Sequence, residues 1–330
     1  MFLSGEDLIF KNELKDVIPA SVSTSRSKLW PFVDRAEKTF ILPILEKPLY
    51  DSLTSYYQDR DGWTSGTDED KAMYDGLIKL VQISLINLAY YLGFDVLNVK
   101  LSDAGFQRAE GESFKGLYKY QEENLRTYFR ETGFNGIEDI LTYLETNIEY
   151  FSEWEDSSIY TTRKTSLIKD VATFDAICSI SNSRLIFLRL QRYMREVIDF
   201  EIKPLLGDEY ATLISEIAKA SPVPKYSALL VEVQKPIAYL SCARLIENTG
   251  NITDKGLFFE GKNSLFPDDT TRRSANSDEI AGLRSLYNVN GYKYIEALRQ
   301  YLINNSFTEQ GSVEGNVFNR DNTDKKTFIA

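Results

Sequence analysis

The chain has 330 residues, of which 43% are hydrophobic and 13% aromatic, so it is long and apolar enough for about two folded domains. Its formal net charge of −11 excludes a general nucleic-acid-binding surface, although an acidic wall could line a channel through which DNA passes. Histidine is absent, and with it the commonest general base and the commonest metal ligand.

Neither the cysteines nor the start of the chain indicates an oxidising or membrane environment. Cys178 and Cys242 belong to no spaced cluster and are interpreted as buried apolar residues, with a disulfide or a nucleophile as the alternative. No signal peptide is recognisable. The longest uncharged apolar stretch, residues 80–94, is shorter than the roughly 20 residues that span a bilayer, so we expect a soluble protein.

The first half of the chain is predicted to be mainly helical. Helices are expected over residues 6–15, 29–42, 49–57, 71–94, 117–130 and 137–151. The helix over 29–42 should end at Pro43, because proline lacks an N–H and disfavours the helical conformation of its predecessor. The helix over 71–94 carries the strongest signal, an apolar residue at every third or fourth position.

A small β-hairpin is predicted after the longest helix of this half. Residues 96–101 alternate in polarity, and a returning strand could start at Phe106. In the turn between them, Asp103 would cap the backbone with its side chain and Gly105 would supply a positive φ. The alternative, that Asp103 is a general base, is weaker because an aspartate two residues before a glycine is typical of a turn.

The second half repeats this order. Helices are expected over residues 185–203, 209–219, 227–248, 278–287 and 292–304. Pro204 matches Pro43, since Ile202-Lys-Pro-Leu-Leu206 aligns with Ile41-Leu-Pro-Ile-Leu45. Asp254 and Gly256 match Asp103 and Gly105 in a second predicted turn.

This ordered pair of matches predicts a tandem duplication. We place the domain boundary in the polar connector around residues 154–165, which gives one helical repeat over residues 1–155 and another over 156–305. A spacing of about 160 residues is too long for a solenoid repeat of roughly 20–50 residues. The predicted fold class is therefore mainly α, with two tandem duplicated helical domains, each with a small β-hairpin, and an extended C-terminal arm.

The C-terminal arm, residues 306–330, is polar and has no helical stripe. It is either a disordered tail or an arm that orders on a neighbouring subunit. In the second case its apolar residues would be the anchors. The candidate anchors are Val317, Phe318, Phe328 and Ile329.

No motif carries a convincing chemistry. Residues 111–116 imitate the start of a phosphate loop, but Leu117 and Tyr118 follow where lysine and serine or threonine are required. The acidic loop over residues 59–70 could be read as a calcium site, yet its glycine comes too early for an EF-hand, which favours a solvated loop. We therefore assign no catalytic residue, no metal and no cofactor, and expect a protein that is not an enzyme.

Residues 199–210 carry a resemblance to a known family. Asp199-Phe-Glu-Ile-Lys-Pro-Leu-Leu-Gly207-Asp-Glu-Tyr210 resembles the head–tail connector (adaptor, or ring) proteins of tailed bacteriophages. The tandem form is similar to ring proteins of crAss-like phages and related prophages. The earlier copy departs from the pattern at Glu46, where the later copy has Gly207.

The resemblance implies a structural virion protein that is assembled in the cytoplasm of a host bacterium. Its partners would be further copies of itself in a ring, expected to be twelve-fold, the portal protein, and tail or further ring proteins. DNA would be passing cargo only, and no membrane would be bound. The alternative is a non-catalytic binding module, a host-side helical protein that captures a peptide or glycan through its aromatic residues.

Overall fold

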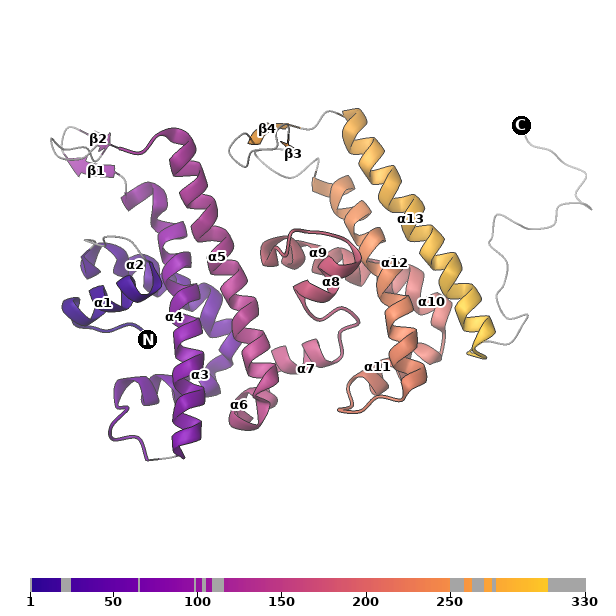
Figure 1. Cartoon of the computed structure of the whole chain (residues 1–330), viewed down its shortest axis with the longest axis horizontal. Coiled ribbons are helices and arrows are strands. Elements are labelled where there is room, and N and C mark those ends of the chain that lie inside the picture. Colours follow the sequence, from indigo (N-terminus) through magenta and orange to yellow (C-terminus); the bar gives the residue numbers. More distant parts are fainter. Residues whose placement is uncertain are drawn as a thin grey trace, which may run out of the picture. The chain divides into compact units, whose positions relative to one another are not determined.

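The computed structural model describes residues 2–18, 25–64, 66–97, 99–102, 105–108, 116–249, 258–262, 270–274 and 277–307. The described residues are mainly helical, which confirms the predicted fold class, and Figure 1 labels the elements along the chain. The chain divides into two compact units, unit 1 (Met1–Leu188) and unit 2 (Arg189–Ala330).

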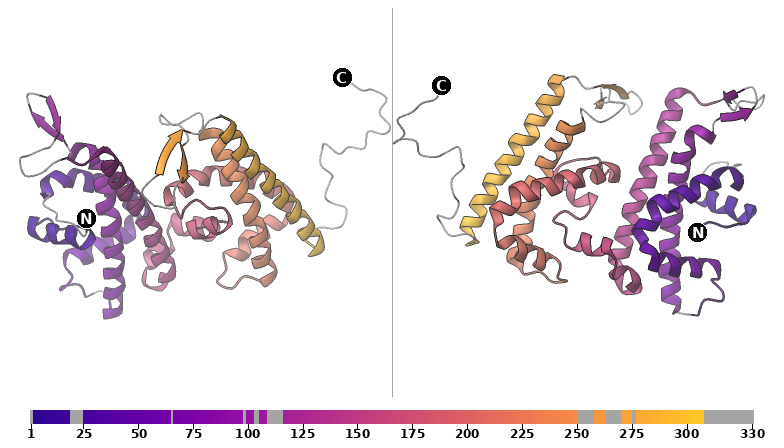
Figure 2. Two further views of the ribbon diagram at one scale, coloured as in Figure 1. Left: turned by 45° about the horizontal axis from the view of Figure 1, so that its top comes forward. Right: turned by 180° about the vertical axis from the view of Figure 1, so that it is seen from behind.

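Unit 1 is organised around a pair of long helices. Its elements are α1 (Asp7–Val17), α2 (Arg26–Ala36), the π-helix η1 (Glu37–Ile41), α3 (Leu42–Gln58), α4 (Asp68–Leu97), β1 (Val99–Ser102), β2 (Gly105–Arg108), α5 (Lys119–Thr146), the 3-10 helix η2 (Ile148–Tyr150), α6 (Ser152–Glu155), α7 (Ser158–Lys164) and α8 (Val171–Ile177). Figures 1 and 2 show α4 and α5 side by side, and the core of the unit is built on α4.

Unit 2 repeats the order of elements that unit 1 has from α2 to α5. Its elements are α9 (Arg184–Val197), which begins in unit 1, the π-helix η3 (Ile198–Ile202), α10 (Lys203–Leu206), α11 (Glu209–Ile217), α12 (Pro224–Thr249), β3 (Phe258–Lys262), β4 (Thr270–Ser274) and α13 (Ser277–Asn304). Here α12 and α13 form the long pair that α4 and α5 form in unit 1.

The duplication extends to individual packing contacts. A Cβ added at Gly133 of α5 would lie 2.7 Å from Cγ of Leu88 on α4. A Cβ added at Gly291 of α13 would lie 2.6 Å from Cγ of Leu240 on α12. In each unit, a glycine therefore lets the second long helix approach a leucine of the first more closely than any side chain would allow.

An aromatic trio also recurs at the other end of each long pair. It consists of a tyrosine early in the first helix, a tyrosine late in the second and a phenylalanine just after it. The trios are Tyr74, Tyr143 and Phe151 in unit 1 and Tyr226, Tyr301 and Phe307 in unit 2. The phenylalanine ring lies 5.8 and 6.1 Å from the two tyrosine rings in unit 1, and 5.7 and 6.3 Å in unit 2.

The prediction that a helix ends at each proline was wrong. The helix passes through Pro43 and breaks three residues later at Glu46 (φ 56°, ψ 164°), and it passes through Pro204 and breaks at Gly207 (φ 55°, ψ −130°). A π-helical turn precedes each proline, with the N–H of Leu42 donating to the Glu37 carbonyl. This turn places the proline at the start of the next helical segment, where its missing N–H costs nothing.

The first β-hairpin reverses where the sequence predicts, and the second does not. β1 and β2 are antiparallel with Ser102 opposite Gly105, while Asp103 lies outside the described residues. β3 and β4 pair with Lys262 opposite Thr270, so that chain reversal lies between these two residues.

The predicted turn at Asp254 and Gly256 therefore does not join these two strands. Both residues come before β3 and lie outside the described part of the chain. An aspartate two residues before a glycine suits many loops, and only the strand pairing decides which loop reverses the chain.

The division between the units also differs from the predicted boundary after residue 155. Residues 156–188 belong to unit 1. Within it, Leu185 and Leu188 pack against the same core cluster as α4 and α5. The polar composition of the connector indicated a linker, but its apolar and charged side chains have partners in unit 1.

Two further predictions concern burial. Cys178 and Cys242 are both buried, as expected.

Among the described residues, α4 is the one helix long and apolar enough to cross a membrane, although half of its most apolar stretch is buried inside the protein. Core helices of soluble proteins pass the same test, so this is weak evidence for a membrane span.

Candidate functional site: two proline corners and their surroundings

Each unit contains a sharp corner built from a π-helix, a proline and a residue with positive φ. We name residues 37–46 corner 1 and residues 198–207 corner 2. Leu45 in corner 1 and Leu206 in corner 2 are buried and anchor the bend in the core. The sequence-predicted residues Pro43, Pro204 and Gly207 therefore all lie at these corners.

Corner 1 is covered by the segment that follows α5. Trp154 of α6 is fully buried, and its indole Nε1–H donates to the main-chain carbonyl of Ile44, 3.0 Å away. Ser52 of α3 donates from its hydroxyl to Glu153 Oε1 at 2.8 Å. The indole thus satisfies a carbonyl within the bend while contributing a large apolar surface to the core.

Glu46 joins the bend to the first turn of α7. Its Oε1 accepts hydrogen bonds from the N–H of Ser158 (2.9 Å), the hydroxyl of Ser158 (2.6 Å) and the N–H of Ile159 (3.3 Å). The first N–H groups of a helix have no partner inside it and favour a negative charge. These bonds offset the strain of a positive φ at a residue other than glycine, which costs about 1–3 kcal/mol.

Corner 2 has a positive φ at the same place and a different residue there. Gly207 takes the positive φ at little cost, and a Cβ added there would meet nothing within 4 Å. Asp208 occupies the N-cap position of α11, but its side chain makes no capping hydrogen bond.

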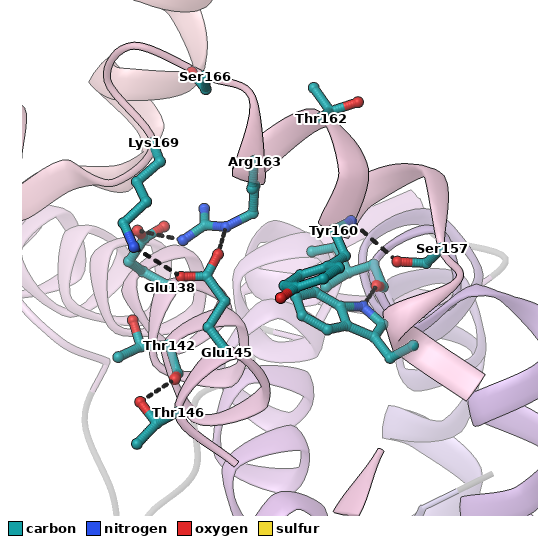
Figure 3. Close-up of polar contacts among 12 residues, drawn as sticks. Glu138, Thr142, Glu145, Thr146, Ser157, Tyr160, Thr162, Arg163, Ser166 and Lys169 are labelled. Atoms are coloured by element: carbon teal, nitrogen blue, oxygen red, sulfur yellow. Dashed lines mark hydrogen bonds and ion pairs between the residues drawn. The ribbon is translucent and has the colours of Figure 1, made fainter. Parts of the chain in front are cut away.

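A largely buried network of charges holds the connector against α5. Glu138 and Glu145 of α5, with side chains 14% and 18% exposed, face Arg163 and Arg184, whose side chains are buried. Arg163 pairs with both carboxylates, Lys169 lies 3.6 Å from Glu145, and Arg184 pairs with Glu138 (Figure 3 shows the Arg163, Glu145 and Lys169 contacts). Opposite charges that are largely buried neutralise one another, so we interpret the network as a structural contact between the connector and α5.

Two backbone groups of the connector reinforce this docking. The N–H of Arg184 donates to Asn135 Oδ1 at 3.0 Å, and the N–H of Val171 donates to Glu138 Oε1 at 3.3 Å. Burial lowers the pKa of Arg184, and the Glu138 carboxylate opposes that shift. Residues 163–184 are thus fixed on one face of α5.

The acidic loop before α4 uses its carboxylates to shape turns. Asp59 Oδ1 accepts the N–H of Gly62 at 3.0 Å, and Asp70 Oδ2 accepts the N–H and the hydroxyl of Thr67 at 2.7 and 2.8 Å. The Thr67 N–H lowers the pKa of Asp70, and the Thr67 hydroxyl adds to this effect. Across the described ranges, no group of three or more histidine, cysteine or acidic residues could hold a metal ion.

Two exposed apolar surfaces were not foreseen from the sequence. Tyr118 and Tyr120, at the start of α5, stack with ring centroids 6.0 Å apart and are 71% and 61% exposed. On α13, Leu286, Val289 and Tyr292 are 54%, 50% and 52% exposed. Exposed apolar groups on successive turns of one helix are typical of an interaction surface.

The remaining predicted residues fall in two groups. Gly105 pairs with Ser102 at the first reversal. The candidate arm anchors lie outside the described residues, and these are Val317, Phe318, Phe328 and Ile329. The sequence analysis did not predict that Trp154 and Glu46 hold corner 1, nor did it predict the charge network. The one signal for the role of Glu46 was that corner 1 has an acidic residue where corner 2 has glycine.

The comparisons with known proteins agree with the tandem organisation. The model of a family described as "Family of unknown function (DUF6712)" matches residues 41–164 and 202–312. The chain belongs to this family. The two matched stretches of this DUF6712 protein begin at Ile41 and Ile202, which are equivalent positions two residues before the prolines of the two corners. No curated protein matches the chain. No solved structure matches it either.

Proposed function

We propose that this DUF6712 protein is a structural virion protein, a subunit of a homo-oligomeric ring that joins the portal of a phage capsid to the tail. The observation that carries the proposal is the sequence of corner 2 and the helix after it, residues 199–210, which resembles head–tail connector proteins. A corner with a positive φ three residues after the proline recurs in unit 1, which supports a tandem form of such a protein.

The construction of each repeat supports a mechanical role. Glycine-mediated packing of the long helices gives a stiff element, because it depends on close contacts that tolerate little movement. A ring under load requires such elements, with contacts to neighbours made from exposed helix faces and extended segments. The acidic loop over residues 59–70, the hairpins and the C-terminal residues 306–330 are the segments proposed to reach neighbours.

The partners follow from this role. They are further copies of the chain in a twelve-fold ring, the portal protein, and tail or additional ring proteins. DNA would be passing cargo, because a net charge of −11 disfavours adhesion of a polyanion to the lumen. Assembly would take place in the cytoplasm of the host bacterium, with the finished protein in the virion.

The test is an assembly measurement on the full chain. Native mass spectrometry and negative-stain electron microscopy, with and without the portal protein of the same virus, should show a ring that binds the portal. A chain that stays monomeric at high concentration, both alone and with the portal, would contradict the proposal.

The stacked tyrosines favour a second candidate, a non-catalytic module that binds a peptide or glycan. Tyr118 and Tyr120 present a large exposed aromatic surface, and aromatic faces bind sugar rings and apolar side chains. Glycan and peptide arrays should then show binding that is lost in the Tyr118→Ala, Tyr120→Ala double variant. Equal signals from the double variant and the wild type would exclude this candidate.

A further inference from the structure

We propose that a stripe of arginines on α9 is the docking surface for the acidic loop of a second copy of the chain. This inference rests on the proposed ring function and names two surfaces that would meet in the ring. The arginine stripe is Arg189, Arg192 and Arg195, all in unit 2, and the acidic loop is residues 59–70 of unit 1.

The arginine stripe occupies one exposed face of α9. Its members are three residues apart, which places them within about 120° of the helix circumference. All three residues are exposed, and Arg192 pairs with Glu196 at 3.2 Å. Among the described residues, Arg189 and Arg195 have no carboxylate within ion-pair distance. The stripe therefore presents two uncompensated positive charges.

The acidic loop is packed onto unit 1 through its tryptophan. Trp63 is half-buried, and its ring centroid lies 5.1 Å from that of Tyr56 on α3 and 5.3 Å from that of Tyr74 on α4. A Cβ added at Gly66 would lie 2.5 Å from Cη2 of Trp63, so the chain also passes close to the edge of the indole. A loop that is already ordered loses less conformational entropy when it docks.

The same loop presents two uncompensated negative charges. Asp61 and Glu69 are exposed and make no hydrogen bond or ion pair with another described residue. Asp68 is fully exposed but lies 3.9 Å from Lys71, which partly compensates its charge. The loop and the stripe thus match in the number of their uncompensated charges and are opposite in sign, which is the condition for electrostatic complementarity.

Each of the two surfaces occurs in one repeat only. Counted back from the π-helices, the arginine stripe corresponds to Lys28, Pro31 and Asp34 of α2, whose charges cancel. The loop before α12, residues 218–223, contains no acidic residue. Repeat 1 therefore supplies the acidic surface and repeat 2 the basic one. A contact between different surfaces of two copies is heterologous and generates a ring when its rotation closes.

Phosphate groups of DNA are the other occupant that a basic stripe would fit. DNA carries one negative charge per roughly 1.7 Å of helix axis, and proteins that bind it make several phosphate contacts. Here two arginines are uncompensated, and the carboxylate of Glu196 lies beside Arg192. The small charge of the acidic loop fits this stripe better than a polyanion does.

The first test reverses the charge of the stripe and compares it with a matched control. The stripe variant is Arg189→Glu, Arg195→Glu, and the control is Lys28→Glu, Arg35→Glu on α2, where both residues are exposed. Native mass spectrometry of the full chain is carried out where the wild type forms its ring. The stripe variant should lose the oligomer, and the control should keep it. Circular dichroism should show both variants folded, because all four substituted residues are exposed.

The second test shows whether the contact joins different chains. The loop variant, Asp61→Lys, Glu69→Lys, should lose the oligomer by itself. Mixed in equal amounts, the stripe variant and the loop variant should form an oligomer in which the two chains alternate, because each altered surface then meets one of opposite charge. A mixture that stays monomeric, or a loop variant that assembles alone, would overturn the assignment of the acidic loop.

The outcomes separate the inference from the proposed function. A wild-type ring that the stripe variant leaves intact overturns the docking surface and leaves the ring function standing. Fluorescence anisotropy with labelled duplex DNA provides a further check. Binding that the stripe variant loses and the loop variant keeps would assign the stripe to phosphate groups and overturn the inference. A wild-type chain that is monomeric with and without portal protein overturns both the inference and the ring function.

Discussion

The two units share a backbone and a set of core contacts, and they differ in what lies against their corners. Glycine meets leucine between the long helices of both units, and the same aromatic trio closes the other end of each pair. Corner 1 is covered by Trp154 and by α7, whereas in the described part of the chain nothing lies within 4 Å of a Cβ added at Gly207 in corner 2. Duplication has kept the interior and left the surface to diverge.

The corners also show two solutions to one backbone problem. The residue three places after the proline must take a positive φ in both units. At Gly207 a positive φ causes little strain because glycine has no Cβ. At Glu46 the same φ is strained, and the hydrogen bonds to Ser158 and Ile159 offset that strain. A glutamate can offset this strain only where the first N–H groups of a helix lie within hydrogen-bonding distance. Glu46 therefore occurs in the corner against which α7 packs.

The largest expected effect comes from removing the side chain that covers corner 1. Trp154→Ala should destabilise unit 1 by about 3–5 kcal/mol, since it deletes a fully buried aromatic side chain and leaves the Ile44 carbonyl without its donor. Hydrogen exchange should show faster opening of α3 and α4 and unchanged protection of α12. Trp154→Phe keeps most of the packing and should cost less, and equal losses in the two variants would contradict this account.

Breaking the charge network should have the next largest effect. Arg184→Met leaves Glu138 with one fewer cation in a largely buried place, which should cost about 3 kcal/mol in a urea unfolding experiment. The double variant with Glu138→Leu should recover part of that loss, because it also removes the buried charge. A double variant less stable than the sum of the single losses would show that the network is not the cause.

Substitutions at the two positive-φ residues, Glu46 and Gly207, should have smaller effects on stability. Gly207→Ala should destabilise unit 2 by about 1–3 kcal/mol through backbone strain alone, since the added Cβ meets nothing. Glu46→Gly relieves strain but loses the α7 cap, so its net effect on unit 1 should lie within about 1 kcal/mol. Thermal unfolding of both variants measures the difference, and a large loss in Glu46→Gly with none in Gly207→Ala would reverse the interpretation.

The smallest expected effect is a pH dependence confined to unit 1. Burial raises the pKa of Glu37 above its ordinary value of 4.5, and a hydrogen bond from Tyr50 partly opposes this. Glu37 therefore contributes stability that is full below that ordinary value and is lost as the pH rises through the raised pKa. Ile198 takes this place in unit 2.

Glu37→Gln should flatten the pH dependence of unit 1 stability above pH 4.5 and leave that of unit 2 unchanged. Hydrogen exchange followed at a series of pH values on α3 and α12 separates the two units. Identical profiles for the variant and the wild type would show that Glu37 titrates in the folded protein as it does in the unfolded chain.

The sequence alone predicted the elements that depend on local patterns. Apolar spacing located the long helix over residues 71–94, observed as Asp68–Leu97, because apolar residues recur along it with the period of a helix. Aligned prolines at 43 and 204 revealed the tandem arrangement, since the residues around them form the same corner. Gly105 marked the first reversal, where it pairs with Ser102, but the same pattern at Asp254 and Gly256 did not mark the second.

Tertiary structure decided what depends on distant partners. The π-turns moved each break from the proline to Glu46 and Gly207, because backbone hydrogen bonding shifted along the helix. Strand pairing moved the second reversal away from Gly256 to the connection between Lys262 and Thr270. The cover on corner 1 joins Trp154 to Ile44 across a long separation in the chain, and such a contact leaves no local pattern by which a single sequence could reveal it.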